Sequence, residues 1–356
     1  MIDLMCLQEK MNSTKYMVLF MFLSLVALFG AKPAWGEEKL GNFSLYFEND
    51  FFGGTDRYYT NGVKLSWISP DLNDYAESDK LPDWSLPYIR RLPFINEPGL
   101  QRNIGLSMGQ NMYTPGDISR EDMIEDDRPY AGWGYFGISF HSKSEHRLDS
   151  MEIQLGIVGP ESFAEQTQKF AHKLLASQRP RGWKNQLKNE PGLTVAYERK
   201  WRLFQAGTVG GLAFDTIPHL GGVLGNVYTY ANAGMEARLG WNIPKDFGTS
   251  LIRPAGDFNA PVKVRGLFPS GNHEFSLILF ASADGRAVLH DIFLDGNTLT
   301  ESHSVDKRHF VANAAVGVSL ITHRLKLSYA RVLQTKEFKE QPDNQSFGSL
   351  TFSFFW

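Results

Sequence analysis

The last eight residues of the chain, "SLTFSFFW", place large apolar and small polar side chains in alternate positions. In an extended strand, successive side chains point to opposite faces. One face of this segment is therefore aromatic and apolar, and the other carries serine and threonine. A period of two indicates β-strands with one apolar face, which must be covered by a protein core or by lipid, and one polar face. The same alternation recurs at 43–48, 63–67, 151–157 and 325–329.

Two architectures fit such alternation. A β-sandwich would bury the apolar faces in a core, whereas an outer-membrane barrel would turn them to lipid around a polar lumen. The expected strands run to about ten residues, longer than the roughly five or six usual in globular sheets, and aromatic residues lie at their ends. We therefore predict an all-β fold, a transmembrane antiparallel β-barrel of about twelve strands. These are expected near 40–49, 59–69, 102–112, 131–142, 148–158, 192–202, 204–217, 227–242, 273–289, 308–321, 323–335 and 346–356.

The N-terminus has the pattern of a secretory signal. Two lysines precede the apolar run 17–29, and cleavage is expected after Gly36, which leaves 37–356 as the barrel. The run is shorter than the roughly 20 residues of a spanning helix. The single cysteine, Cys6, lies in this segment, so the exported barrel needs no disulfide. A formal charge of −3 argues against a nucleic-acid partner.

Topology then sorts the connections between strands. With the N-terminus in the periplasm, odd strands run outward and even strands return, so most inner turns are short. Two inner connections, 70–101 and 243–272, are long and rich in proline and glycine. Either these connections are periplasmic insertions, or the strand count misses elements there.

One helix is expected outside the barrel, over Ser162–Ser177. Ser162 is a candidate N-cap, with Glu165 three residues later as in a capping box. Gln168 and His172 are one turn apart on one face, and a histidine there could act as a general base near neutral pH. A lone helical histidine is more often a surface or packing residue. A partial apolar face comprises Phe163, Phe170, Leu174 and Leu175.

The stretch "YFENDFFGGTDRYYTNG" brings polar residues to the outer rim of the first two strands. Strand parity points Asp50 and Thr60 toward the lumen and Asn49 outward. Carboxylate, amide and hydroxyl oxygens suit a hard cation such as Ca²⁺, although nothing here resembles an EF-hand. Ordinary turn chemistry explains the same residue types.

Two further motifs contain residue types that active sites use. The segment "GLSMG" matches a nucleophile elbow, but Ser107 lies mid-strand with no helix after it, so a lumen-facing serine is expected. In "EDDRPYAGWGYFG", an ion pair between Asp127 and Arg128 is expected to brace the rim. Arginines that could also bind anionic headgroups of a substrate are Arg120, Arg128, Arg179 and Arg181.

Together, these segments resemble the outer-membrane lipid A 3′-O-deacylases of Gram-negative bacteria. The matching pieces are "FENDFF", "TDRYYTNG", "DRPYAG", and "GIVGP" followed by "QKFAHKLL", in the same order along most of the mature chain. The resemblance implies a twelve-stranded barrel in the outer membrane with its site at the outer rim. It implies removal of the 3′ acyloxyacyl chain of lipid A, hence lipopolysaccharide as substrate, in a Ca²⁺-dependent reaction. No obligate protein partner is implied.

The resemblance also carries functional positions onto this chain. It implies a catalytic His172, a glutamine in the same helix at Gln168 that binds substrate, and a catalytic group that comprises Asn49, Asp50 and Thr60, the last two also as metal ligands. One position departs from the family. Six residues after the histidine the family has a glutamate linked to the metal site, and here that position is Gln178.

The hypothesis from the sequence is ester hydrolysis without a covalent intermediate. His172 would take a proton from the attacking water, and Ca²⁺ would polarise the 3′ ester carbonyl. The alternatives are an outer-membrane phospholipase and a non-enzymatic barrel such as a channel or adhesin. A phospholipase would leave lipid A intact, and a channel would conduct without releasing acyl chains.

Overall fold

The computed structural model describes residues 41–53, 57–77, 81–92, 97–206, 211–249, 251–253, 275–322 and 324–355. The predicted signal over 1–36 and the aromatic terminus Trp356 lie outside these residues. Thirteen strands occur in the described part: β1 Asn42–Asn49, β2 Tyr58–Ile68, β3 Gln101–Thr114, β4 Ala131–Lys143, β5 Arg147–Val158, β6 Glu190–Trp201, β7 Phe204–Ala206, β8 Leu212–Gly225, β9 Tyr228–Trp241, β10 Phe275–Asp291, β11 Phe310–Thr322, β12 Leu325–Gln334 and β13 Gln345–Phe355.

Twelve of these strands form a closed antiparallel ring. Each pairs with its neighbour in sequence, β1 pairs with β13, and β6 pairs with β8 to complete the barrel. The short β7 pairs with the inner half of β8 while β6 pairs with its outer half. The turn expected at residue 203, between the expected strands 192–202 and 204–217, was therefore wrong, because the wall continues through β7 after a break at 202–203. The expected strand 204–217 was also wrong in its bounds, since the wall strand that follows is β8, Leu212–Gly225. The predicted barrel of about twelve strands is confirmed.

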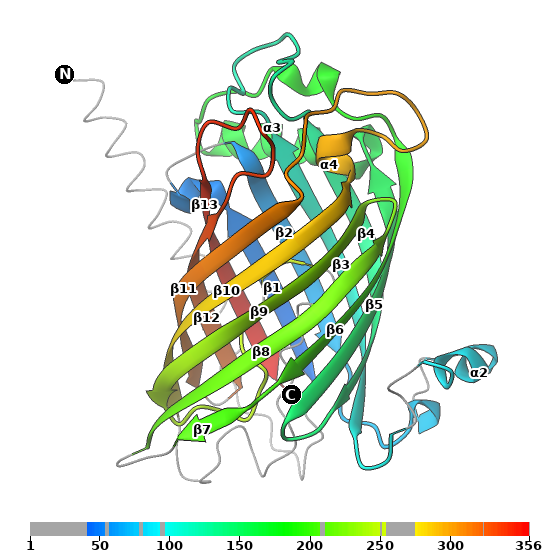
Figure 1. The fold of residues 1–356 in the computed structure, drawn as a ribbon, viewed down its shortest axis with the longest axis vertical. Coiled ribbons are helices and arrows are strands. Elements are labelled where there is room, and N and C mark those ends of the chain that lie inside the picture. Colours follow the sequence, from blue (N-terminus) through cyan, green and yellow to red (C-terminus); the bar gives the residue numbers. More distant parts are fainter. Residues whose placement is uncertain are drawn as a thin grey trace.

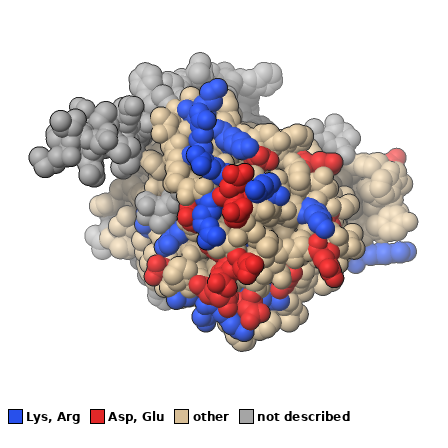
Figure 2. All heavy atoms as spheres, turned by 90° about the horizontal axis from the view of Figure 1, so that it is seen from above, with Lys and Arg blue, Asp and Glu red and all other residues tan. Residues whose placement is uncertain are grey.

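The helices mark the two ends of the barrel (Figure 1). At the outer end lie η4 (Pro160–Ser162), α3 (Ala164–Leu174), η5 (Gly182–Asn185) and α4 (Ile292–Asp295). The connection from β2 to β3 carries η2 (Tyr75–Glu77), η3 (Asp83–Ser85) and α2 (Leu86–Ile89) at the inner end. In the described residues, no helix has the length and apolarity that a membrane span requires. Seen from above, acidic and basic side chains intermingle over the outer loops (Figure 2).

The wall alternates as the sequence predicts. On the outside, Phe136, Leu155 and Leu224 expose 69%, 60% and 70% of their surface. On the inside, polar side chains pair with one another: Ser107 donates to Glu152 Oε1 at 2.8 Å. That serine faces the lumen, which confirms the predicted non-catalytic placement.

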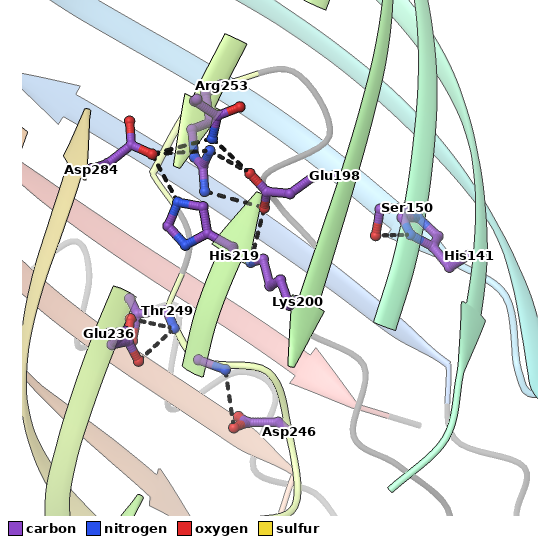
Figure 3. Close-up of polar contacts among 12 residues, drawn as sticks. His141, Ser150, Glu198, Lys200, His219, Glu236, Asp246, Thr249, Arg253 and Asp284 are labelled. Carbon is purple, nitrogen blue, oxygen red and sulfur yellow. Dashed lines mark hydrogen bonds and ion pairs between the residues drawn. The ribbon is translucent and has the colours of Figure 1, made fainter. Parts of the chain in front are cut away.

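The connection after β9 enters the lumen from the inner end. Its Asp246 forms ion pairs with Arg238 and Lys326, and the Thr249 N–H donates to Glu236. Farther along, Arg253 donates to Glu198 at 2.6 Å. Figure 3 shows Arg253 between Glu198 and Asp284, beside His219 and Lys200, with Glu236, Asp246 and Thr249 in the same view. His219 bonds Asp284, and Lys200 lies 3.6 Å from Glu198. The described part of this long connection therefore fills barrel interior rather than extending into the periplasm.

Candidate active site

Helix α3 lies against the outside of the barrel wall, over β4 and β3. At Gly132 of β4, an added Cβ would stand 2.1 Å from Ser162 Oγ and 2.3 Å from Ala164 Cβ. Only glycine allows so close an approach. Gln110 of β3 fixes the same turn, because its Nε2 donates to the Ser162 carbonyl at 2.6 Å. The helix therefore starts in contact with the outward face of two strands.

The entry to α3 differs from the predicted capping box. Ser162 belongs to η4, and its hydroxyl donates to the Gly159 carbonyl at 2.6 Å. The N-cap is Phe163, in the left-handed region with φ 60°, and no side chain caps the helix. Gly159 has φ 101°, and an added Cβ there would meet the Lys188 carbonyl at 2.7 Å. The chain therefore turns onto the wall through backbone geometry rather than through a serine cap.

The two faces of α3 are reversed relative to a soluble surface helix. Ala164, Gln168 and His172 are buried, with exposures of 1%, 2% and 8%. Phe170 and Leu174 expose 70% and 63%. A helix that turns polar groups toward the protein and apolar groups outward suits a membrane interface, where lipid covers the apolar side.

The hydrogen bond of His172 defines its tautomer. Its Nδ1 bonds the main-chain carbonyl of Gln178. A carbonyl only accepts, so Nδ1 carries the proton, and in the neutral ring the lone pair is on Nε2. A general base needs this arrangement. The Gln178 backbone supplies the contact whatever the side chain, so the departure from the family's glutamate does not affect it.

Trp183 orients the amide of Gln168. The indole Nε1–H of this buried residue of η5 donates to Gln168 Oε1 at 2.7 Å. Because the oxygen accepts this bond, the Nε2 end of the amide points the other way. That nitrogen is buried, and no residue that the structure describes forms a hydrogen bond with it. An amide donor held in this way is available to an oxygen of a ligand.

The outward position of Asn49 is confirmed by the strand register. Asn49 pairs with Asn61 of β2, Asn61 with Met112 of β3, and Met112 with Gly132 of β4. These four residues form one row across the outward wall, and α3 begins at its far end. With neighbouring strands about 4.8 Å apart, the row spans roughly 14 Å.

A bulge changes the expected orientation of Thr60. The register between β2 and β3 shifts between Tyr59 and Asn61. Thr60 Oγ1 lies 2.7 Å from Thr114 Oγ1, and Thr114 is on the outward face of β3, two residues after Met112. The prediction of a lumen-facing Thr60 was therefore wrong, because the extra residue of a bulge breaks strand parity.

Asp50 is the first residue of the helix η1 (Asp50–Gly53), so strand parity no longer places its side chain. Asn49 Oδ1 accepts the Phe51 N–H at 2.8 Å, and Asp50 Oδ2 accepts the Arg57 N–H. Asp50 is buried, with 1% exposure. These bonds close the loop between β1 and β2 onto the strand ends.

The donor types at the ends of β1 and β2 suit a hard cation. A carboxylate, the Thr60 hydroxyl and the Asn49 amide oxygen are ligands that Ca²⁺ accepts. In the part of the chain that the structure describes, no group of three or more His, Cys, Asp or Glu side chains could hold a metal. A shell of roughly six to eight oxygens would therefore need main-chain carbonyls, water or substrate.

Arg128 is held by Glu337 and Tyr113. Its Nη1 donates to Glu337 at 2.9 Å, its guanidinium lies 4.6 Å from the Tyr113 ring centre, and it is 1% exposed. The expected partner was wrong: Asp127 instead accepts the main-chain N–H groups of Gly116 and Arg128. Burial raises the pKa of Asp127. The predicted contact of Arg128 with a lipid headgroup was also wrong, because its guanidinium is buried. Arg120, Arg179 and Arg181 are exposed.

The sequence did not point to Trp183 or Thr114. Trp183 follows the helix in a loop without periodicity, and Thr114 gains its partner only through the bulge. Only the bulge and the fold of the outer loop bring these side chains to Gln168 and Thr60.

Comparison with known proteins agrees with this architecture. A family model described as outer membrane protein LpxR matches residues 18–356. The chain belongs to the LpxR family. It is accordingly an outer-membrane protein of a Gram-negative bacterium.

Among solved structures, LpxR from Salmonella typhimurium superposes with a TM-score of 0.67 at 18% sequence identity, covering 88% of this chain and 100% of that one. At this identity the likeness shows the LpxR fold alone. The beta domain of the Bordetella autotransporter BrkA matches at a TM-score of 0.42 and 7% identity, over 89% of this chain and 98% of that one, and carries no argument. Comparison with curated proteins finds no match.

Proposed function

We propose that this chain is a lipid A 3′-O-deacylase. Membership of the LpxR family supports the proposal, as do the motifs that resemble the outer-membrane lipid A deacylases. One observation carries it: a buried histidine with the tautomer of a general base lies on the lipid side of the wall, in a helix whose opposite face is apolar and exposed. Polar groups on that side of a barrel are costly and are retained for function.

The reaction follows from the placement of these groups. Nε2 of His172 takes a proton from water, and the oxygen of that water attacks the 3′ ester carbonyl. Gln168 Nε2 donates to the oxyanion that develops, since its amide is already oriented by Trp183. The 3′ alkoxide leaves with a proton returned by His172, which releases the acyloxyacyl chain as a carboxylic acid.

The ends of β1 and β2 would supply a metal site. Asp50 and Thr60 would hold Ca²⁺, and Asn49 would position the water or the ester. When bound, Ca²⁺ supplies a Lewis acid at an ester oxygen. Asp50 is the only carboxylate among these residues, because Gln178 stands where the family has a glutamate. We therefore expect weaker calcium binding than in family members with that glutamate.

The outer surface around α3 suits an anionic lipid. Phe163, Phe170 and Leu174 would meet acyl chains in the outer leaflet. The exposed Arg120, Arg179 and Arg181 would meet phosphate groups above them. The substrate would therefore approach sideways from the membrane rather than through the lumen.

A competition assay tests the proposal. Purified barrel in detergent is given lipid A and phosphatidylethanolamine together with Ca²⁺, and both lipids are followed by mass spectrometry. We expect lipid A to lose one acyloxyacyl group and the phospholipid to remain intact. Conversion of phosphatidylethanolamine to lysophospholipid, with lipid A unchanged, would replace this proposal with a phospholipase.

A further inference from the structure

The inner connection between β2 and β3 folds back onto the outside of the wall. Leu81 and Ile89 are buried, with exposures of 8% and 6%, in a cluster with Ile104 of β3 and Phe140 of β4. Phe140 is on the outward face, like the exposed Phe136 of the same strand. In Figure 1, α2 projects to the right of the barrel at the level of its inner end, far from α3. Segment 81–92 is therefore an external attachment at the inner leaflet.

A groove runs between segment 81–92 and the wall, and we refer to it as the α2 groove. Its lining is almost entirely apolar, and it comprises Leu81, Trp84, Tyr88, Leu92, Ile138 and Ile153, with neighbouring residues of the same segments. Ile138 and Ile153 pair directly across β4 and β5. The next outward pair on the same two strands is Phe136 and Leu155, both widely exposed. The groove therefore continues the lipid-facing belt without interruption.

The mouth of the groove has the composition of a membrane interface. Trp84 and Tyr88 expose 73% and 65% of their surface, a large amount for aromatic side chains. Such residues gather at headgroup level in barrels and helices alike. Arg90 and Arg91 follow directly and are also exposed. Arg90 lies 3.8 Å from Asp74, an exposed pair that water screens.

We propose that the α2 groove binds a phospholipid of the inner leaflet of the outer membrane. One acyl chain would lie along Ile138 and Ile153 beneath Trp84 and Tyr88, and the phosphate would meet Arg90 and Arg91. The continuity of the groove with the lipid belt and the charge of its rim favour this occupant. The inference rests on the fold and the outer-membrane location and is independent of the deacylase proposal.

Native mass spectrometry of the full barrel with phosphatidylethanolamine tests the site. Wild type should retain one phospholipid, whereas W84S/Y88S and R90E/R91E should each bind about tenfold more weakly. These side chains are exposed, so the barrel should still fold. Leu289→Ser is a matched control, because Leu289 is also 73% exposed but lies at the outer end of β10. Equal binding by all four proteins, or an equal loss in the control, would overturn the proposal.

Fluorescence in vesicles tests the site in a bilayer. The emission of Trp84 is isolated as the difference between wild type and Trp84→Phe. Phosphatidylethanolamine brominated along its acyl chains should quench this emission, most strongly with bromine near the headgroup. Absence of quenching, even with binding in detergent, would show that the lipid is a detergent-state contact and would overturn the site.

Discussion

The barrel lumen and the outward wall beneath α3 both bury polar side chains, but they bond them differently. In the lumen, charges meet opposite charges: Lys64 Nζ lies 3.1 Å from Glu152 Oε1, and the two side chains are 0% and 1% exposed. Beneath α3, Gln168 bonds an indole and His172 bonds a main-chain carbonyl. The lumen contacts cross the barrel between strands, whereas the α3 contacts fix the orientation of single side chains.

This difference distinguishes polar residues that stabilise the barrel from polar residues that serve the reaction. Barrels tolerate a polar interior, so charged networks there brace the wall and hold the inner connection. On the lipid side, apolar residues would stabilise the fold at a lower desolvation cost than an amide and an imidazole do. We therefore attribute these two polar side chains to function. The location of a polar residue, inside or outside the wall, is therefore a better guide to function than its identity.

Two histidines give the largest contrast. Replacing His172 with glutamine should lower the rate of lipid A deacylation about 10³-fold, because it removes the general base. His219 bonds Asp284 in the lumen at 2.8 Å, and His219→Gln should leave the rate unchanged. Initial rates on lipid A in detergent measure both. Equal losses of rate in the two variants would contradict a catalytic role that is confined to the histidine on the outward wall.

Substitutions of charged residues in the lumen should change the stability of the barrel rather than the rate of deacylation. Lys64→Met removes the ion pair between Lys64 and the buried Glu152 and should lower the free energy of unfolding by roughly 3 kcal/mol. Replacing both residues, as Lys64→Met with Glu152→Gln, should recover most of that loss. Urea unfolding in detergent, followed by electrophoretic mobility, compares the three proteins. A double variant no more stable than the single one would contradict a bracing ion pair.

A substitution at Gly132 tests whether the position of α3 against the wall affects the deacylation rate. A valine there would collide with Ser162 and Ala164 and should lift the start of the helix from the wall. We expect the deacylation rate to fall about 10²-fold from misplacement alone, with the barrel still folded. Gly222, on the wall at β8, is the control position, and Gly222→Val should keep full activity. Activity retained in Gly132→Val would remove α3 from the site.

Trp183 should act as a positioning residue. Trp183→Phe keeps the ring in its cluster and removes the hydrogen bond to Gln168, and we expect about a tenfold lower kcat. KM should change little, because the amide would still be present. A change confined to KM would instead mean that Trp183 only shapes the surface where lipid binds.

Calcium should bind weakly, and one substitution should tighten it. Chelation of Ca²⁺ should stop deacylation without altering barrel stability. Gln178→Glu restores the carboxylate of the family and should lower the calcium concentration for half-maximal rate about threefold. Glu340→Gln, at an exposed outer-loop position, is a control for changes in general surface charge. An unchanged calcium dependence in Gln178→Glu would place the metal away from α3.

Strand periodicity was sufficient to predict the barrel. Alternation predicted eleven of the twelve wall strands within a few residues, because lipid on one side and polar side chains on the other impose a period of two. The expected strand 204–217 was displaced, since the wall strand there is β8, Leu212–Gly225. Alternation failed where the backbone leaves that period. In the sequence, the break at 202–203 cannot be told from a turn between two strands. The bulge turns the Thr60 side chain from the lumen to the outward face, and no residue type in the sequence signals it.

The candidate site was accessible mainly through residue types and family resemblance. Gln168 and His172 share a helical face by spacing, and the structure buries both, in contact with Trp183 and the Gln178 carbonyl. Arg128 was misjudged because its partner Glu337 lies 209 residues away, beyond any local pattern. The two long inner connections could not be placed either, since one enters the lumen and the other packs outside through contacts between distant strands.

The lipid A mass spectrum of cells tests the central claim most directly. Cells that express wild type should show lipid A lacking one acyloxyacyl group, and cells that express His172→Ala at an equal level in the outer membrane should show it intact. Cells that express His219→Ala should match wild type. Identical spectra for wild type and His172→Ala would contradict an active site on the outward wall beneath α3.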